Sequence, residues 1–343
     1  MEAVSPRSRS RDWTLRLFEA SPLAPVRTGL ALVLAYVALA VVWRAATAPF
    51  APPGGARPLP LAWELVNGLV IAIPLTANAI ARRGALRDLR DLSAALPGGA
   101  AEAAGLCDAV AGAPRGALAL ASGAASLVML LVVLFDPAVW GAAGRPPTSD
   151  PELAWSLFHN VASGYVFGRM WAAEIALTQG FARVAGRVRI DLLDAAPLAP
   201  FARRAQRSAG LWILVSSCVS LFWLGGQPSL VNALVLAIAL ATIAHAFALP
   251  LARLRGRIAA AKRAELAQAN RLLAEERARL AAGDGTPGRV ADLVAWRGLV
   301  LAVREWPVNT GTLVRSALFA LVGVGSWLGG ALVDRLLDAA LPR

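Results

Sequence analysis

Long apolar stretches alternate with arginine-rich stretches along the whole chain. Helices of about 17 to 25 mostly apolar residues can cross a bilayer, because every backbone group is hydrogen-bonded within the segment. Seven stretches approach or reach this length, at residues 28–47, 61–81, 117–135, 153–170, 210–225, 230–250 and 312–333. The pattern predicts an all-α fold class, namely a polytopic helical membrane protein with about seven transmembrane helices.

The segments that connect these stretches differ in charge. Those expected on one side of the membrane hold 28 basic residues, and those on the other side hold four. The basic segments are residues 1–27, 82–116, 169–209 and 251–311. Since positively charged loops remain in the cytoplasm, we expect these segments and the N-terminus inside, and the tail 334–343 outside.

The composition agrees with a membrane protein and narrows its source. Hydrophobic residues make up 57% of the 343 residues, charged residues make up 16%, and the mean hydropathy is +0.57. A net charge of +12 could indicate nucleic-acid binding, but the loop asymmetry accounts for it, so no nucleic-acid partner is expected. Lys262 is the only lysine. A chain rich in alanine and arginine with almost no lysine fits a bacterium with GC-rich DNA. We therefore expect the protein in the bacterial inner membrane.

Two pairs of matching strings indicate an internal repeat. LVNGLVIAI at 65–73 returns as LVNALVLAI at 230–238, and PLAP at 22–25 returns at 197–200. Because four predicted spans separate the copies, both would have the same orientation, giving a parallel repeat of four plus three spans. Chance similarity among residues drawn from few apolar types is the alternative.

The segment 251–282 is predicted to continue the sixth span as a charged cytoplasmic helix. Leu266, Leu273 and Leu280 have heptad spacing, but Ala269 and Glu276 occupy the positions between them. The helix could pack on its own protein or form an intermolecular coiled coil.

Glycine-rich breaks bound the predicted cytoplasmic helices. Residues 283–288 end the charged helix and begin a flexible link to the last span. Residues 82–96 are predicted to form an amphipathic helix at the inner interface, ended by the turn at 97–99. The fourth span is expected to continue as a helix beyond the membrane.

Four polar side chains fall in the outward parts of predicted spans that run inward: Asn67, His159, Asn160 and Asn232. Polar groups in hydrocarbon are costly unless they are paired, so these should face one another or water. They could line an outward-opening polar vestibule, or they could be hydrogen-bonded between helices. Arg44 and Glu64, near the same boundary, are placed to form an ion pair.

Two glycine pairs have the GxxxG spacing of closely packed membrane helices. Gly164 and Gly168 lie in the fourth predicted span, and Gly325 and Gly329 lie in the last. These four positions are candidate helix-packing residues.

No catalytic, cofactor or metal site can be assembled from the sequence. A P-loop needs a lysine after glycine, and Lys262 follows alanine. His159 and His245 would lie at depths that differ by roughly 13 Å, which rules against a shared metal. We therefore expect no enzyme activity, no metal and no cofactor.

Two aspartate pairs have D-x-x-D spacing, which places both carboxylates on one helical face. Asp88 pairs with Asp91, and Asp191 pairs with Asp194. Divalent ions bound to diphosphates use such pairs, whereas aspartates that cap helices beside arginines are commoner. Both interpretations concern segments predicted to be cytoplasmic.

Two longer strings resemble a known group of proteins. RVRIDLLDAAPLAPFARRAQRS at 187–208 and REWPVNTGTLVRSALFALVGVGSWLGGALVDRLLD at 304–338 resemble segments of an uncharacterised family of bacterial multi-pass inner-membrane proteins. The resemblance covers about the last half of the chain and implies no activity, substrate or catalytic residue.

Two functional classes follow from these patterns. The first is a signalling or scaffolding protein, whose segment 251–282 meets a second copy or a cytoplasmic protein. The second is a transporter or channel, with the polar vestibule enclosed between parallel repeats. In both classes the lipid bilayer is a partner.

Overall fold

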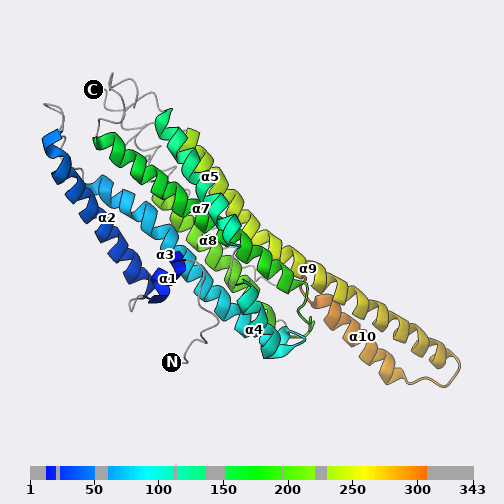
Figure 1. Ribbon diagram of the computed structural model, residues 1–343. Coiled ribbons are helices and arrows are strands. Elements are labelled where there is room, and N and C mark those ends of the chain that lie inside the picture. The colour runs from blue at the N-terminus through cyan, green and yellow to red at the C-terminus, as the bar shows by residue number, and fades with distance from the viewer. Residues whose placement is uncertain are drawn as a thin grey trace.

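The structure is a computed structural model that describes residues 13–20, 24–50, 61–110, 114–135, 151–194, 196–220 and 230–306. Every regular element in these ranges is helical, which confirms the all-α class for this part of the chain (Figure 1). The elements are α1 (Trp13–Ala20), α2 (Pro25–Thr47), η2 (Ala48–Phe50), α3 (Leu61–Asp91), η3 (Leu92–Ala95), α4 (Gly99–Val110), α5 (Arg115–Leu134), α7 (Pro151–Ala185), η5 (Ala196–Leu198), α8 (Ala199–Ser220), α9 (Leu230–Ala281) and α10 (Pro287–Ala302).

Three helices fulfil the length and composition required of membrane spans among the described residues: α2, α3 with its continuation to Ala95, and α5. They correspond to the first three predicted spans. α2 packs on α3, and α5 packs on α7. Both α2 and α5 leave large apolar side chains exposed, among them Leu34 of α2 at 61% and Leu120 of α5 at 76%. Apolar exposure on this scale fits helices whose outer faces contact lipid.

The other predicted spans are placed less completely. Residues 153–170 lie within α7, the stretch 210–225 enters α8 up to Ser220, and 230–250 begins α9. The predicted seventh span, 312–333, lies outside the described residues, and so do Gly325 and Gly329. The seven-span count and the parallel repeat therefore stay predictions.

Three helices extend far beyond the apolar stretches that predicted them. α3, α7 and α9 have 31, 35 and 52 residues. The segment 82–96, predicted as an amphipathic helix at the inner interface, forms the end of α3 followed by η3. Its apolar residues Leu89 and Leu96 are buried among other helices. Gly99, with a φ of +60°, forms the expected turn before α4.

The largest cluster of buried apolar side chains lies mainly among segments predicted to be cytoplasmic. It joins the ends of α3, α7 and α8 to η3, α4 and the middle of α9. Phe181 of α7 meets Phe201 of α8 edge-on, with ring centroids 6.1 Å apart. Arg257 of α9 donates to the carbonyl oxygens of Gly186 and Val188, just after α7 ends. These segments thus form a packed bundle, which we call the inner bundle because its segments are predicted to face the cytoplasm.

α9 continues past this inner bundle and pairs with α10 (Figure 1). Nζ of Lys262 donates to the carbonyl oxygens of Leu301 and Val303, both at 2.8 Å. Nε of Arg297 donates to Oδ1 of Asn270 at 3.0 Å. These partners show that the two helices run antiparallel. We call residues 259–303 the arm, and Figure 1 shows it projecting beyond the other helices.

The arm differs from the flexible link expected after residue 283. Val290, Leu293, Trp296 and Val300 recur every three or four residues, so α10 has an apolar face of its own. That face covers the face of α9 that carries the heptad leucines, which we call the heptad face. On it, Ala269 and Glu276 are only 2% and 5% exposed. The irregular heptad of α9 therefore packs against a helix of the same chain.

Candidate functional site

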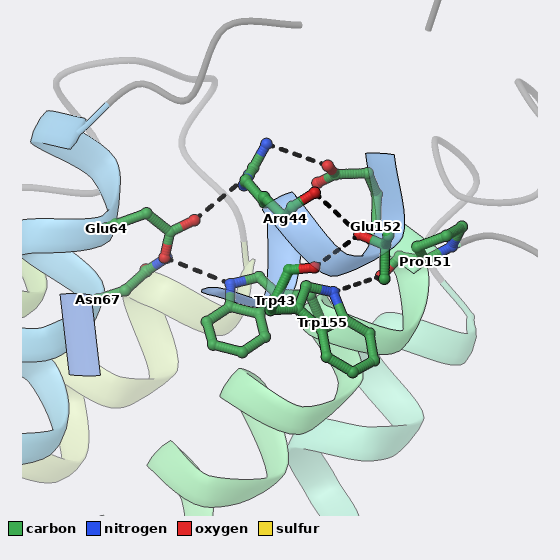
Figure 2. Close-up of polar contacts among 8 residues, drawn as sticks. Trp43, Arg44, Glu64, Asn67, Pro151, Glu152 and Trp155 are labelled. Carbon is green, nitrogen blue, oxygen red and sulfur yellow. Dashed lines mark hydrogen bonds and ion pairs between the residues drawn. The ribbon is translucent and has the colours of Figure 1, made fainter. Parts of the chain in front are cut away.

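An ion-pair cluster joins the ends of three helices at the predicted outer boundary (Figure 2). Arg44 lies in the last turn of α2, Glu64 in the first turn of α3 and Glu152 in the first turn of α7. The Arg44 guanidinium lies 3.3 Å from Glu64 and 3.0 Å from Glu152. The expected pairing of Arg44 with Glu64 is thus present, and α7 joins it through Glu152.

The Glu64 carboxylate is buried and accepts further hydrogen bonds. Its side chain is 3% exposed, and Oε2 accepts from Nε1 of Trp155 at 3.3 Å and from Nδ2 of Asn67 at 3.5 Å. The indole of Trp155 also stacks on that of Trp43, at 6.0 Å between centroids. A buried carboxylate is tolerated when cationic and polar donors replace its water.

A second buried group lies one helical turn deeper on α7. The Tyr36 hydroxyl lies 3.0 Å from Nδ1 of His159, and the Ser163 hydroxyl lies 3.4 Å from its Nε2. Both imidazole nitrogens therefore have partners from the bundle. The Tyr36 ring also packs on Trp155 at 5.6 Å, which links this group to the ion-pair cluster above it.

The proposed vestibule residues are placed as follows. Asn67 bonds to Glu64 of its own helix, and Asn160 donates to the carbonyl oxygen of Ser156, also on its own helix. His159 is bonded across helices to Tyr36. Asn232 lies on α9, but its side chain is outside the described residues.

The glycine pair of the fourth predicted span lies at a close helix contact. A Cβ added at Gly164 would lie 2.6 Å from the Ala125 carbonyl oxygen, and one added at Gly168 would lie 2.2 Å from that of Ala121. Both acceptors belong to α5. The two glycines therefore let the backbones of α5 and α7 approach more closely than any side chain would allow.

A buried network that was not expected from the sequence joins α7 and α8, at the ends predicted to face the cytoplasm. Oε1 of Glu174 accepts from Nη2 of Arg204 at 2.6 Å, from the Ser208 hydroxyl at 2.5 Å and from the Thr178 hydroxyl at 3.2 Å. The Arg204 and Glu174 side chains are 3% and 6% exposed. The only sign of it in the sequence is a pair of polar residues four positions apart on each helix, Glu174 with Thr178 and Arg204 with Ser208.

The aspartates of the first D-x-x-D pair are occupied by arginines from α8. Asp88 is 1% exposed and pairs with Arg207 at 2.8 Å and with Arg203 at 3.4 Å, while Asp91 pairs with Arg203. Arg207 crosses the face of Gly84, where a Cβ would lie 2.1 Å from its Nη1. Arginine pairing therefore describes this pair better than metal binding.

The second pair, Asp191 and Asp194, lies in the loop before α8. Oδ1 of Asp191 accepts from the backbone amides of Leu193 and Asp194, and Oδ1 of Asp194 accepts from that of Ala196. These bonds fit the capping interpretation. Within the described residues, no group of three or more histidine, cysteine or acidic side chains could hold a metal ion.

Replacing Trp155 by phenylalanine should lower the free energy of unfolding by about 2 kcal/mol, because it removes a donor to a buried carboxylate. Replacing Trp43 by phenylalanine is the matched control. Nε1 of Trp43 donates to a neutral carbonyl, that of Pro151 at 3.3 Å, and we expect a loss of about 1 kcal/mol. Thermal unfolding of both variants in lipid nanodiscs measures the difference. Equal losses would contradict a special role for Glu64.

In comparisons with known proteins, no family model, no curated protein and no solved structure matches the chain.

Proposed function

We propose that the chain is a seven-span protein of the bacterial inner membrane that acts as a scaffold or signalling component, with the arm as the element that meets its partner. The topology is supported by the 28 basic residues in one set of connecting segments against four in the other. The arm, a two-helix hairpin that leaves the bundle and exposes apolar side chains, carries the functional part of the proposal.

The return path of α10 supports a seventh span. Arg255 lies 3.7 Å from Glu305, and its guanidinium lies over the Trp306 ring at 5.2 Å. The chain therefore comes back beside residue 255, close to residue 250, where the sixth predicted span ends. The next predicted span begins at residue 312, only a few residues after Trp306, so it would start close to the end of the sixth.

The surface of the arm is suited to protein contact. Four large apolar side chains are 37% to 56% exposed on it: Leu272, Val294, Leu299 and Leu301. Between 251 and 306 the chain has eleven basic and six acidic residues. Two helices alone bury only one face each, so the outer faces remain free to bind a protein. The heptad face is covered by α10, so a partner would dock on these outer faces.

The contacts give less support to the transport hypothesis. A transport site needs polar groups that a substrate can reach. Asn67, Asn160 and both ring nitrogens of His159 instead have partners within the bundle. Interhelical and intrahelical pairing accounts for these residues, and we therefore favour the scaffold function.

A shortened arm tests the proposal. A Gly-Ser turn in place of residues 266–298 would join 265 to 299, which lie opposite each other in the antiparallel pair. We expect native mass spectrometry from nanodiscs to show that the full chain retains a second copy and that the shortened chain does not. Leu120→Ala, at an exposed position on α5, is the control that should leave the copy number unchanged.

Cysteine labelling tests a partner other than a second copy. In a Cys107→Ser, Cys218→Ala background, Val294→Cys should react several-fold more slowly with a membrane-impermeant maleimide in inverted membrane vesicles than in purified protein. An unchanged copy number together with equal labelling rates would reject the arm as an interaction element.

A further inference from the structure

α1 is a short amphipathic helix held against the bundle by its buried face. Leu15 and Phe18 are 7% and 1% exposed and pack with Ala79 of α3. Two arginines of α3 fasten the end of α1. Arg82 lies 3.0 Å from Glu19, and Nη2 of Arg83 donates to the Phe18 carbonyl oxygen at 2.9 Å.

The start of α1 is fastened to α7. Nε1 of Trp13 donates to the Tyr165 hydroxyl at 3.0 Å, and the same hydroxyl accepts from Nη1 of Arg169 at 3.2 Å. α1 therefore crosses the bundle between residues 79–83 of α3 and 165–169 of α7. The second and fourth predicted spans end at 81 and 170, so α1 lies at the level expected for the inner lipid headgroups.

The opposite face of α1 is apolar and exposed. Trp13 and Leu17, one turn apart, are 51% and 42% exposed, and Arg16 is exposed beside them. The first turns of α2, the next helix along the chain, also expose large apolar side chains: Val26 and Leu30 are 66% and 59% exposed. Indole rings and short amphipathic helices are favoured at the bilayer interface.

Exposed arginines follow the contact with α1 along α3. Arg83, Arg87 and Arg90 are all exposed and recur every three or four residues from the contact with α1. In the part of the chain that the structure describes, Arg16, Arg87 and Arg90 form no ion pair with a carboxylate, whereas Arg203 and Arg207 nearby do. Each unpaired guanidinium can donate two parallel hydrogen bonds to a phosphate.

We propose that α1 and the exposed arginines of α3 form a binding surface for the anionic phospholipids of the inner leaflet. Trp13 and Leu17 insert among the headgroups, while Arg16, Arg87 and Arg90 bind lipid phosphates. This inference rests on the proposed topology, but not on the role of the arm. A lipid fits better than an acidic protein, because Trp13 and Leu17 lie at the level expected for the inner headgroups, and α2, the next helix along the chain, is a candidate membrane span with exposed apolar side chains.

Lipid retention tests the surface. The full chain is released for native mass spectrometry from nanodiscs of equal parts phosphatidylglycerol and phosphatidylcholine. We expect phosphatidylglycerol to be enriched on the wild type, and the triple variant Arg16→Gln, Arg87→Gln, Arg90→Gln to lower that enrichment about tenfold or more. The control Arg271→Gln, Arg277→Gln, Arg304→Gln removes the same charge at the arm and beside it. A triple variant that retains the enrichment, or a control that loses it equally, overturns the proposal.

The depth of α1 gives a second readout. A nitroxide attached at Leu17→Cys, in the Cys107→Ser, Cys218→Ala background, should be relaxed more by oxygen than by a water-soluble nickel chelate. The same label at Arg271→Cys on the arm should show the reverse. A label at position 17 that behaves like the one at 271 overturns the proposal. Failure of the arm as an interaction element would leave both lipid readouts unchanged, so the two proposals fail separately.

Discussion

Replacing Arg204 by methionine is expected to lower the free energy of unfolding by about 3 to 5 kcal/mol. Glu174 would then keep only the hydroxyls of Ser208 and Thr178 as donors, in a site where its side chain is 6% exposed. A buried carboxylate without a counter-charge is costly, because hydroxyl dipoles replace only part of its hydration. Thermal unfolding in nanodiscs, followed by the loss of helix signal, measures the effect.

Two further variants separate the charge from the packing. Adding Glu174→Gln to Arg204→Met should restore most of the lost stability, since the orphaned charge disappears. Arg203→Gln removes an arginine whose side chain is 50% exposed, and it should cost less than about 1 kcal/mol. If the single Arg204→Met variant is as stable as the double variant, the buried ion pair does not have the importance assigned to it.

Replacing Gly168 by valine should separate α5 from α7 and cost about 3 kcal/mol. The added Cβ alone would lie 2.2 Å from a backbone oxygen of α5, which cannot move aside as a side chain can. Cysteines at Ser126 and Val161, whose residues are joined by a hydrogen bond of 3.0 Å, report the separation. Their disulfide yield should fall in the Gly168→Val protein.

Gly123 provides a matched control on α5 itself. It is also a helical glycine, but nothing lies within 4 Å of the Cβ that a substitution would add. Gly123→Val should therefore leave the disulfide yield unchanged, although it makes the same chemical change. A similar fall in both variants would show that valine disturbs α5 itself rather than its contact with α7.

Local patterns in the sequence were enough to predict some of these features. The Arg44–Glu64 pair follows from two charges at the outer ends of consecutive spans joined by a short loop. The Gly164 and Gly168 contact follows from GxxxG spacing on one helix, although the identity of the partner, α5, does not. In each case the informative residues lie close together in the chain.

Features that depend on which helices become neighbours could not be predicted in this way. Asp88 and Arg207 are 119 residues apart, and no local pattern pairs them. Several segments of the inner bundle were expected to be helical, but the packing of this bundle could not be predicted. Its arginines dominate the charge count, and buried residues such as Phe181 and Phe201 are too widely spaced to form a long apolar stretch. α10 was missed because the glycines before it indicated a flexible link.

The antiparallel legs of the arm return the chain to the point at which it left the bundle. The height of the tip is therefore set by helix length alone, roughly 35 Å from Ile258 to Ala281 at 1.5 Å per residue. Insertions of equal length in both legs would raise the tip and leave every contact of the bundle in place. Reach and anchorage are thus separate properties of this chain, and each can change without disturbing the other.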